Sequence, residues 1–296
     1  MRAGPRGGRD SGRGSAVLQS VDVAGVEVLH WNPRTPLPLR PRRAFRWTRH
    51  LPLAPRVDNV GDLLGPEVVR QQVRARGLRA ADGSSVAPLG AVGSVLHMLP
   101  PGAVVWGAGV NGKHRDLELP ADLDLRAVRG PLTGRYLTEN GRTDPGVYGD
   151  PALLLDLGPL RGRGAPGPAA PGERSGVLWI DNLNERRPGV PPPGVRSRSP
   201  RERIATLIEA IDRSELVIGS SLHALVLAEV LGVPARGILS EAEPPLKYLD
   251  YYEGSGRAGV RLAHDVEEAL SLGGVPRGPT IDPALRESFP ADLWRR

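Results

Sequence analysis

Short apolar runs alternate with amphipathic segments along most of the chain. Residues 103–109 (AVVWGAG), 177–180 (VLWI) and 216–219 (LVIG) are brief and strongly apolar. Such runs are typical of strands that are covered on both faces of a parallel sheet. Residues 201–212 carry apolar side chains at every third or fourth position, which predicts an amphipathic helix. The alternation of the two patterns predicts an α/β protein with doubly wound sheets.

Turn and capping residues extend this prediction to further elements. Pro131 favours a helix start because its fixed φ angle suits the first helical position, and Gly141 favours the end of that helix. By the same reasoning, Gly65-Pro66 predicts the start of an earlier helix that ends at Gly77. The remaining expected elements are strands at 26–31, 123–130 and 235–239, a strand and turn over 146–155, a helix from Ser221 to about Leu231, and a helix capped by Asp265 that runs to about Leu272.

The alternating pattern is interrupted once, by residues 158–174. This stretch is mostly Gly, Pro, Ala and Arg, a composition typical of linkers and long loops. The sequence therefore predicts two α/β domains. The expected division is a basic, Pro- and Arg-rich, partly disordered arm over residues 1–56, a domain over 57–160, a linker over 161–174, a second domain over 175–275, and a tail over 276–296.

The positive charge of the chain is concentrated near its N-terminus. The 296 residues carry a net charge of +6, and residues 1–50 alone carry +7 from ten Arg against three acidic residues. The rest of the chain is close to neutral, so we do not expect nucleic acid as the main partner. Peripheral contact between the arm and an anionic membrane remains open.

Several classes of chemistry are excluded by composition. The chain has no cysteine, which rules out disulfides, thiolate nucleophiles and Cys-ligated metals. Its six histidines show no paired metal-ligand spacing, so we expect no metal site. With no signal peptide and no apolar run of about 18 residues, a cytoplasmic location is expected.

Residues 219–235 (GSSLHALVLAEVLGVPA) carry the strongest candidate for a binding site. A strand ends at Gly219 and a helix starts at Ser221, so free backbone N–H groups gather there. Ser220, Ser221 and His223 would surround an anion at that point. The competing interpretation is structural, with serine as a helix cap and His223 as a partly buried histidine.

Three other segments contain candidate residues. Arg129 follows a strand and precedes a helix, where a guanidinium suits a carboxylate or phosphate, although a structural ion pair with an Asp is an alternative. Asn59, Gly61 and Asp62 lie in a predicted loop, where Asp62 is a candidate proton acceptor or a simple turn residue. Lys247 is one of only two lysines, with Lys113, among 37 Arg, which suggests a functional ammonium group.

Taken in order, these segments resemble the polysaccharide pyruvyl transferase family, in the branch linked to exopolysaccharides such as succinoglycan. The resemblance covers about residues 57–255. Its six motifs are N-x-G-D at Asn59–Asp62, W-G-x-G at Trp106–Gly109, R-G-P at Arg129–Pro131, Y-G-D-P at Tyr148–Pro151, S-S-x-L-H-type at Ser220–Ala224 and K-[FY]-x-D-Y at Lys247–Tyr251.

The resemblance implies a fold and a reaction. It implies two Rossmann-like domains in a GT-B-like arrangement, with phosphoenolpyruvate as the donor substrate between them and no other cofactor. The acceptor would be a sugar or a lipid-linked oligosaccharide. The implied roles are catalysis by His223 and Asp62, and substrate binding by Arg129, Ser220, Ser221, Lys247, Asn59 and Gly61.

Three alternatives to this function remain at the level of sequence, one of which is a member of the same family that binds sugar but has no activity. A nucleotide-sugar glycosyltransferase of the GT-B type has a similar architecture, and fold does not fix function. A non-catalytic protein could instead bind anionic surfaces through its Arg-rich arm, with salt-sensitive affinity.

Overall fold

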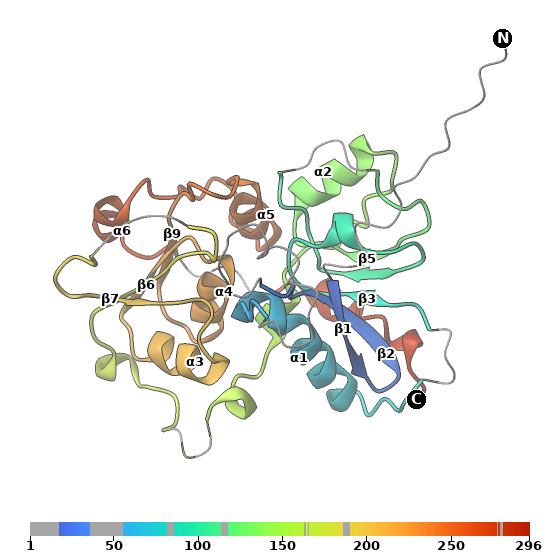
Figure 1. Cartoon of the computed structure of the whole chain (residues 1–296), viewed down its shortest axis with the longest axis horizontal. Helices are drawn as coiled ribbons and strands as arrows, with labels where there is room; N and C mark the ends of the chain where they lie inside the picture. The colour runs from blue at the N-terminus through green and yellow to red at the C-terminus, as the bar shows by residue number, and fades with distance from the viewer. Residues whose placement is uncertain are drawn as a thin grey trace, which may run out of the picture.

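The chain forms two α/β halves that lie side by side, each built on its own sheet (Figure 1). The computed structural model describes residues 18–35, 56–81, 86–113, 118–162, 164, 166–185, 190–276, 278 and 281–296. Most of the predicted N-terminal arm lies outside these residues. Within the described residues, no helix is long and apolar enough to cross a membrane.

The first sheet is mixed and has the strand order β1-β2-β3-β4-β5. Its strands are β1 (Leu18–Val23), β2 (Val26–Trp31), β3 (Leu89–Gly90), β4 (Val104–Trp106) and β5 (Asp124–Ala127). An antiparallel hairpin joins β1 to β2, and the remaining pairs are parallel. Residues 18–31 of the expected arm therefore belong to this sheet, and only the 26–31 strand was predicted.

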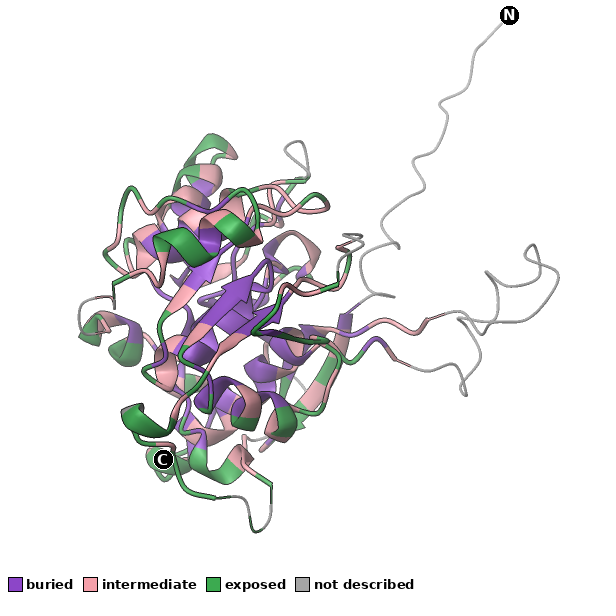
Figure 2. Cartoon of the chain, turned by 90° about the vertical axis from the view of Figure 1, so that its left-hand side faces the viewer, coloured by how far each residue is buried: buried purple, intermediate pink, exposed green. Residues whose placement is uncertain are grey.

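The second sheet is entirely parallel, with the order β7-β6-β8-β9. Its strands are β6 (Val177–Ile180), β7 (Val195–Arg198), β8 (Leu216–Gly219) and β9 (Ala235–Gly237). Figure 2 shows buried strands at the centre of this half and helices whose outer faces are exposed. The predicted α/β class is thus confirmed, with one mixed and one parallel sheet.

The first predicted helix is present as α1 (Val60–Ala75), but it starts earlier than expected. The predicted start at Pro66 is wrong, because Pro66 lies inside the helix. Asn59 precedes the first turn in an extended conformation, and Asp62 stands in that turn. Asparagine before a first turn that contains an acidic residue is itself a helix-start pattern, so two start signals compete here, and the earlier one prevails.

The other predicted helices are present as α2 (Pro131–Glu139), α3 (Ile204–Asp212), α4 (Leu222–Val230) and α6 (Val266–Leu272). Asp265 caps α6 by accepting a hydrogen bond from the Glu268 N–H, as expected. The predicted strand at 146–155 is reduced to one bridge between Val128 and Tyr148, followed by a 3-10 turn over Pro151–Leu154. Two helices were not predicted, α5 (Leu246–Gly254) and α7 (Pro283–Glu287).

The last residues of the chain return to the first half. In Figure 1, α7 and the C-terminus lie beside β1 and β2. Trp294 donates a hydrogen bond from Nε1 to the Val23 carbonyl (2.9 Å) and stacks on Phe289. Phe289 in turn meets the buried Trp106 edge to face. The core of the first half therefore contains side chains from both ends of the described chain.

Helix α5 joins the two halves by packing against the start of α2. A Cβ atom at Gly130 would come within 1.9 Å of the Asp250 carbonyl oxygen, and one at Gly254 within 2.1 Å of the Arg129 carbonyl oxygen. Both glycines therefore permit direct backbone contact between the two elements. This contact holds the carboxyl ends of strands from both sheets near each other, where ligands of parallel sheets commonly bind.

Candidate active site

A cavity of about 220 Å³ opens between the two halves and is lined by residues of both. The first half contributes residues from the start of α1 and from the loops that follow β3 and β4. The second half contributes the starts of α4 and α5 and the loops that follow β6 and β9. The lining residues are Trp31, Asn59, Asp62, Ser94, Val95, Met98, Asn111, Lys113, Asn182, Leu183, Asn184, Ser221, Leu222, His223, Glu243 and Lys247.

Asp62 is the acidic group at the α1 side of the cavity. Its Oδ2 atom accepts a hydrogen bond from Asn59 Nδ2 at 2.5 Å. Burial raises the pKa of the Asp62 carboxyl above its usual range, while the nearby His223, Asn59 and Lys247 act in the opposite direction. A carboxyl group with a raised pKa can exchange a proton closer to neutral pH, as acid–base catalysis requires.

His223 projects from the first turn of α4 toward the first half. Its Nε2 atom lies 3.6 Å from Asp150 Oδ2, and both atoms are buried without a hydrogen-bond partner. On its other side the ring packs against Gly61, where a Cβ atom would come within 2.1 Å of Nδ1. The imidazole is thus held between the start of α1 and the loop after Tyr148, next to the Asp150 carboxylate.

The two lysines of the chain meet at one carboxylate. Lys113 Nζ lies 2.5 Å from Glu243 Oε1, and Lys247 Nζ lies 3.8 Å from Glu243 Oε2. Burial is the main reason that the pKa of Lys247 falls to about 8, and Arg129 lowers it further, whereas Glu243 opposes the shift. Lys247 therefore changes its charge within a range of pH that enzymes commonly experience.

The two serines at the start of α4 have different surroundings. Ser221 is the N-cap residue, lines the cavity and makes no side-chain cap hydrogen bond. Ser220 is fully buried, and its hydroxyl lies within hydrogen-bonding distance of Asp181 (3.0 Å) and Glu185 (2.8 Å). Of these two serines, Ser221 alone lines the cavity.

Arg129 lies behind the cavity wall with 1% of its surface exposed. Its guanidinium pairs with Asp250 (2.9 Å) and donates to Ser94 Oγ (2.9 Å) and to the Val110 carbonyl (2.6 Å). Asp250 is also buried and accepts hydrogen bonds from the Thr133 N–H and hydroxyl. This is the structural ion pair that sequence reasoning had kept as the alternative for Arg129, and it reaches the cavity through Ser94.

The structure brings together five of the eight predicted site residues, namely Asn59, Asp62, Ser221, His223 and Lys247. Gly61 supports His223 from behind, and Ser220 and Arg129 lie outside the lining. Sequence reasoning missed Asp150, Lys113 and Glu243 as site residues. Asp150 belongs to the Y-G-D-P motif and Lys113 is the second of two lysines, so both carried a signal, whereas Glu243 carried none.

The glycines of the W-G-x-G motif make room for neighbouring motifs. A Cβ atom at Gly107, which has a φ of +91°, would lie 2.1 Å from the Pro151 ring. One at Gly109 would lie 2.6 Å from the Arg129 guanidinium carbon. These two glycines therefore allow the Y-G-D-P and R-G-P segments to pack against the loop after β4, which fixes Asp150 and Arg129.

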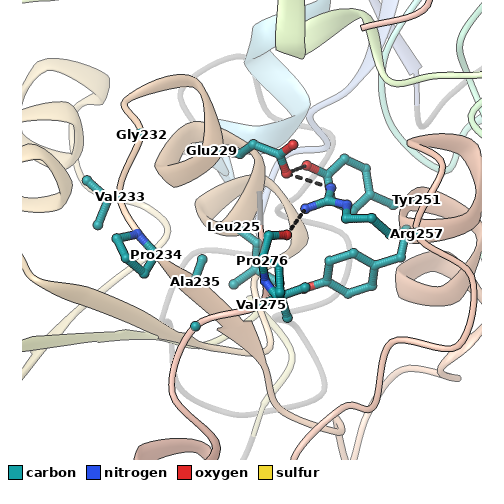
Figure 3. Close-up of a pocket in the computed structure, with 12 residues that line it drawn as sticks. Leu225, Glu229, Gly232, Val233, Pro234, Ala235, Tyr251, Arg257, Val275 and Pro276 are labelled. Atoms are coloured by element: carbon teal, nitrogen blue, oxygen red, sulfur yellow. Dashed lines mark hydrogen bonds and ion pairs between the residues drawn. The ribbon is translucent and has the colours of Figure 1, made fainter. Parts of the chain in front are cut away.

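A second cavity of about 400 Å³ lies at the opposite end of α4 from His223 (Figure 3). Glu229 there accepts hydrogen bonds from the Tyr251 hydroxyl and from Arg257, each at 2.6 Å. The negative charge of Glu229 is balanced by the positive charge of Arg257. In the first cavity, by contrast, two lysines share one carboxylate. Tyr248, Tyr251 and Tyr252 are at most 2% exposed, so they pack α5 onto the second half.

Comparison with known proteins finds similarity over part of the chain. Residues 99–241 match the model of the family described as "Polysaccharide pyruvyl transferase". A curated relative, "Succinoglycan biosynthesis protein ExoV" of Rhizobium meliloti (strain 1021), is 31% identical over 153 residues, which is 48% of this chain and 45% of the relative. The chain thus matches less than half the length of that protein. No solved structure matches this chain.

Proposed function

We propose that the protein transfers a pyruvyl group from phosphoenolpyruvate to two hydroxyl groups of one sugar, because residues 99–241 match the model of the polysaccharide pyruvyl transferase family. The acceptor would be a sugar of an exopolysaccharide or cell-surface glycan precursor, which includes lipid-linked oligosaccharides. The observation that carries the proposal is the cavity between the halves, where residues of three sequence motifs meet (Asn59 and Asp62, Ser221 and His223, and Lys247).

The proposed reaction requires one proton to be delivered and two to be removed. Carbon C3 of phosphoenolpyruvate gains a proton, which leaves a cationic centre at C2. The two sugar hydroxyls form bonds to C2 and release their protons, while the C2–O bond to phosphate breaks and phosphate leaves with the bonding electrons. The protein must therefore hold an anionic donor and exchange protons at two positions.

We assign proton exchange to His223 and Asp62. His223 in its protonated form is the donor to C3, because its ring lines the cavity and the Asp150 carboxylate lies beside it. Asp150 acts as a positioning residue that holds the ring through Nε2, at 3.6 Å in the free protein. Asp62, whose pKa is raised by burial, accepts a hydroxyl proton, with Asn59 holding the carboxyl group in place.

We assign anion binding to Lys247 and to the start of α4. Ser221 and the free N–H groups of the first helical turn suit phosphate oxygens, with the helix dipole adding to the attraction. Lys247 adds a positive charge to the lining of the cavity. Arg129 would act indirectly, by holding Ser94 through a hydrogen bond. Ser220 and Gly61 would support the residues that line the cavity without lining it themselves.

We also propose that the two halves correspond to two Rossmann-like domains in a GT-B-like arrangement. The expected boundaries near residues 160 and 175 are supported by the position of the two sheets on either side of them. In this arrangement the donor lies between the domains, and closure of the domains would exclude water from the cationic intermediate.

The first test is binding of phosphoenolpyruvate, measured by calorimetry. We expect saturable binding by the wild type, strong weakening in Lys247→Ala, and no change in His264→Ala, which removes an exposed histidine remote from the cavity. A folded wild type that binds no phosphoenolpyruvate but binds a nucleotide sugar would instead support a glycosyltransferase.

The second test is transfer itself, followed by mass spectrometry of glycan precursors incubated with phosphoenolpyruvate. His223→Ala should lower the rate by about 10²- to 10⁴-fold, the usual contribution of a general acid. Asp150→Asn should lower kcat with little change in KM, since it positions the catalytic group without touching substrate. Wild-type rates in His223→Ala would disprove the assignment.

A further inference from the structure

The two lysines of the cavity meet at a carboxylate to which the proposed mechanism assigns no role. Lys113 comes from the first half and Lys247 from the second, yet both ammonium groups lie within 4 Å of the same carboxylate, Glu243. Asn184 also donates a hydrogen bond to this carboxylate, at 3.1 Å. Three donors from separate segments therefore converge on one anionic group inside the proposed substrate cavity.

Glu243 is placed as a bound anion would be. Its side chain is 9% exposed and lines the cavity, and its two oxygens are shared between the two ammonium groups. It belongs to the loop between β9 and α5, where its backbone N–H donates a hydrogen bond to Ser240 Oγ at 3.0 Å and its side chain is on neither a helix nor a strand. A carboxylate on such a loop can leave its position at lower cost than one on a helix or strand.

We infer that Lys113, Lys247 and Asn184 form an anion subsite that the chain's own Glu243 occupies in the free protein. An anionic oxygen group of the donor takes this place on binding and displaces the Glu243 carboxylate. The inference rests on the proposed function for the identity of the donor. Phosphoenolpyruvate carries two such groups, a carboxylate and a phosphate, and both have the chemistry that two ammonium groups and an amide recognise.

The inference predicts that a mutation of a residue in the cavity lining, Glu243, increases the affinity for anions instead of lowering it. Removing the charge of Glu243 removes a competitor for the subsite and a repulsive charge next to the ligand, so anion binding should strengthen. If Glu243 serves only to hold the two lysines in place, its removal should weaken binding.

The test is calorimetry at pH 6, which is about two units below the pKa of about 8 of Lys247. Phosphoenolpyruvate, pyruvate and inorganic phosphate are titrated into wild type, Glu243→Gln and Glu241→Gln. The last variant is the matched control, because Glu241 makes the same charge change two residues away on an exposed side chain. We expect Glu243→Gln to bind phosphoenolpyruvate about tenfold more tightly than wild type, and Glu241→Gln to bind it as wild type does.

The smaller ligands identify which group occupies the subsite. A gain for pyruvate alone assigns the subsite to the donor carboxylate, and a gain for inorganic phosphate alone assigns it to the phosphate. Unchanged or weaker binding of all three ligands by folded Glu243→Gln would overturn the inference, as would an equal gain in Glu241→Gln.

Lys113→Gln provides an independent test should Glu243→Gln fail to fold. It should weaken phosphoenolpyruvate binding about fivefold, and it should remove most of the gain when combined with Glu243→Gln. Unchanged binding in Lys113→Gln would contradict the subsite. The wild type could fail to bind phosphoenolpyruvate while Glu243→Gln binds inorganic phosphate more tightly than the wild type does. That outcome would disprove phosphoenolpyruvate as the donor but would still support the anion subsite.

Discussion

Lys247 has an ammonium group whose charge depends on its surroundings. Burial lowers its pKa to about 8, so it is mainly protonated at pH 7 and mainly neutral at pH 9. The neutral form cannot attract an anion, and affinity falls with the fraction of competent protein. Phosphoenolpyruvate affinity should therefore fall about tenfold between pH 7 and pH 9.

Lys247→Arg is the control for this pH dependence, since a guanidinium stays charged throughout the range. Binding by that variant, measured by calorimetry across the same series of pH values, should change little. An equally steep loss in Lys247→Arg would assign the titration to another group.

Gly61 has a specific role that only the structure reveals. A Cβ atom there would come within 2.1 Å of His223 Nδ1, whereas a Cβ atom at Gly65, one turn later in α1, would come no closer than 3.6 Å to Val92. Gly61→Ala should therefore displace the imidazole and lower kcat at least about tenfold, in line with the contribution of a general acid.

Gly65→Ala is the matched control for Gly61→Ala. It should keep full activity and raise the free energy of unfolding by about 0.5–1 kcal/mol, because alanine favours a helix more than glycine does. Steady-state kinetics and urea unfolding of both variants check the pair, and normal kinetics in Gly61→Ala would contradict the proposed contact.

Sequence motifs identify site residues better than they identify contacts. Asn59, Asp62, Ser221, His223 and Lys247 line one cavity, as their shared motifs suggested. The sequence could not show that Asp250, 121 positions from Arg129, neutralises that arginine, or that two carboxylates surround the Ser220 hydroxyl. Both outcomes depend on tertiary packing, which local spacing does not encode.

At the scale of elements, the contact between α2 and α5 depends on one buried ion pair. Arg129 and Asp250 are at most 1% exposed. Asp250→Asn would leave a buried guanidinium without its counterion, and should lower the free energy of unfolding by about 3–5 kcal/mol. Urea unfolding measures this loss.

Asp292→Asn offers a matched comparison at the surface. Asp292 pairs with Arg126 at 2.8 Å, but its side chain is 59% exposed. Exposed pairs contribute below about 1 kcal/mol, so this variant should be close to wild type. Similar losses in the two variants would mean that burial is not what makes the Arg129–Asp250 pair important.

Helices and strands could be predicted where one strong sequence pattern marked them and no second pattern competed with it. The apolar runs at 177–180 and 216–219 coincide with β6 and β8, and Asp265 caps α6. The start of α1 was misplaced because Pro66 offered a second start signal. Strand β3 has only two residues, too few for a periodic pattern.

At the scale of the whole molecule, the first half depends on residues near the C-terminus. Trp294 is 5% exposed and bonds to Val23. Trp294→Ala should destabilise the protein by about 3–5 kcal/mol, whereas Trp294→Phe keeps an aromatic ring and should lose about 1 kcal/mol with the indole hydrogen bond. Thermal unfolding should rank wild type, Phe and Ala in that order. An unchanged melting temperature in Trp294→Ala would show that this packing contributes nothing.

The return of residues 283–294 to the first sheet also bears on how the protein is made. Domains usually fold from the N-terminus as they leave the ribosome. Here the core of the first half includes side chains that are synthesised after the whole of the second sheet. The second half can therefore complete its folding before the first half does. Until Trp106 meets Phe289, an apolar surface stays open to other nascent chains. Chaperones that bind apolar segments should therefore remain on the first half until residues 283–294 have left the ribosome.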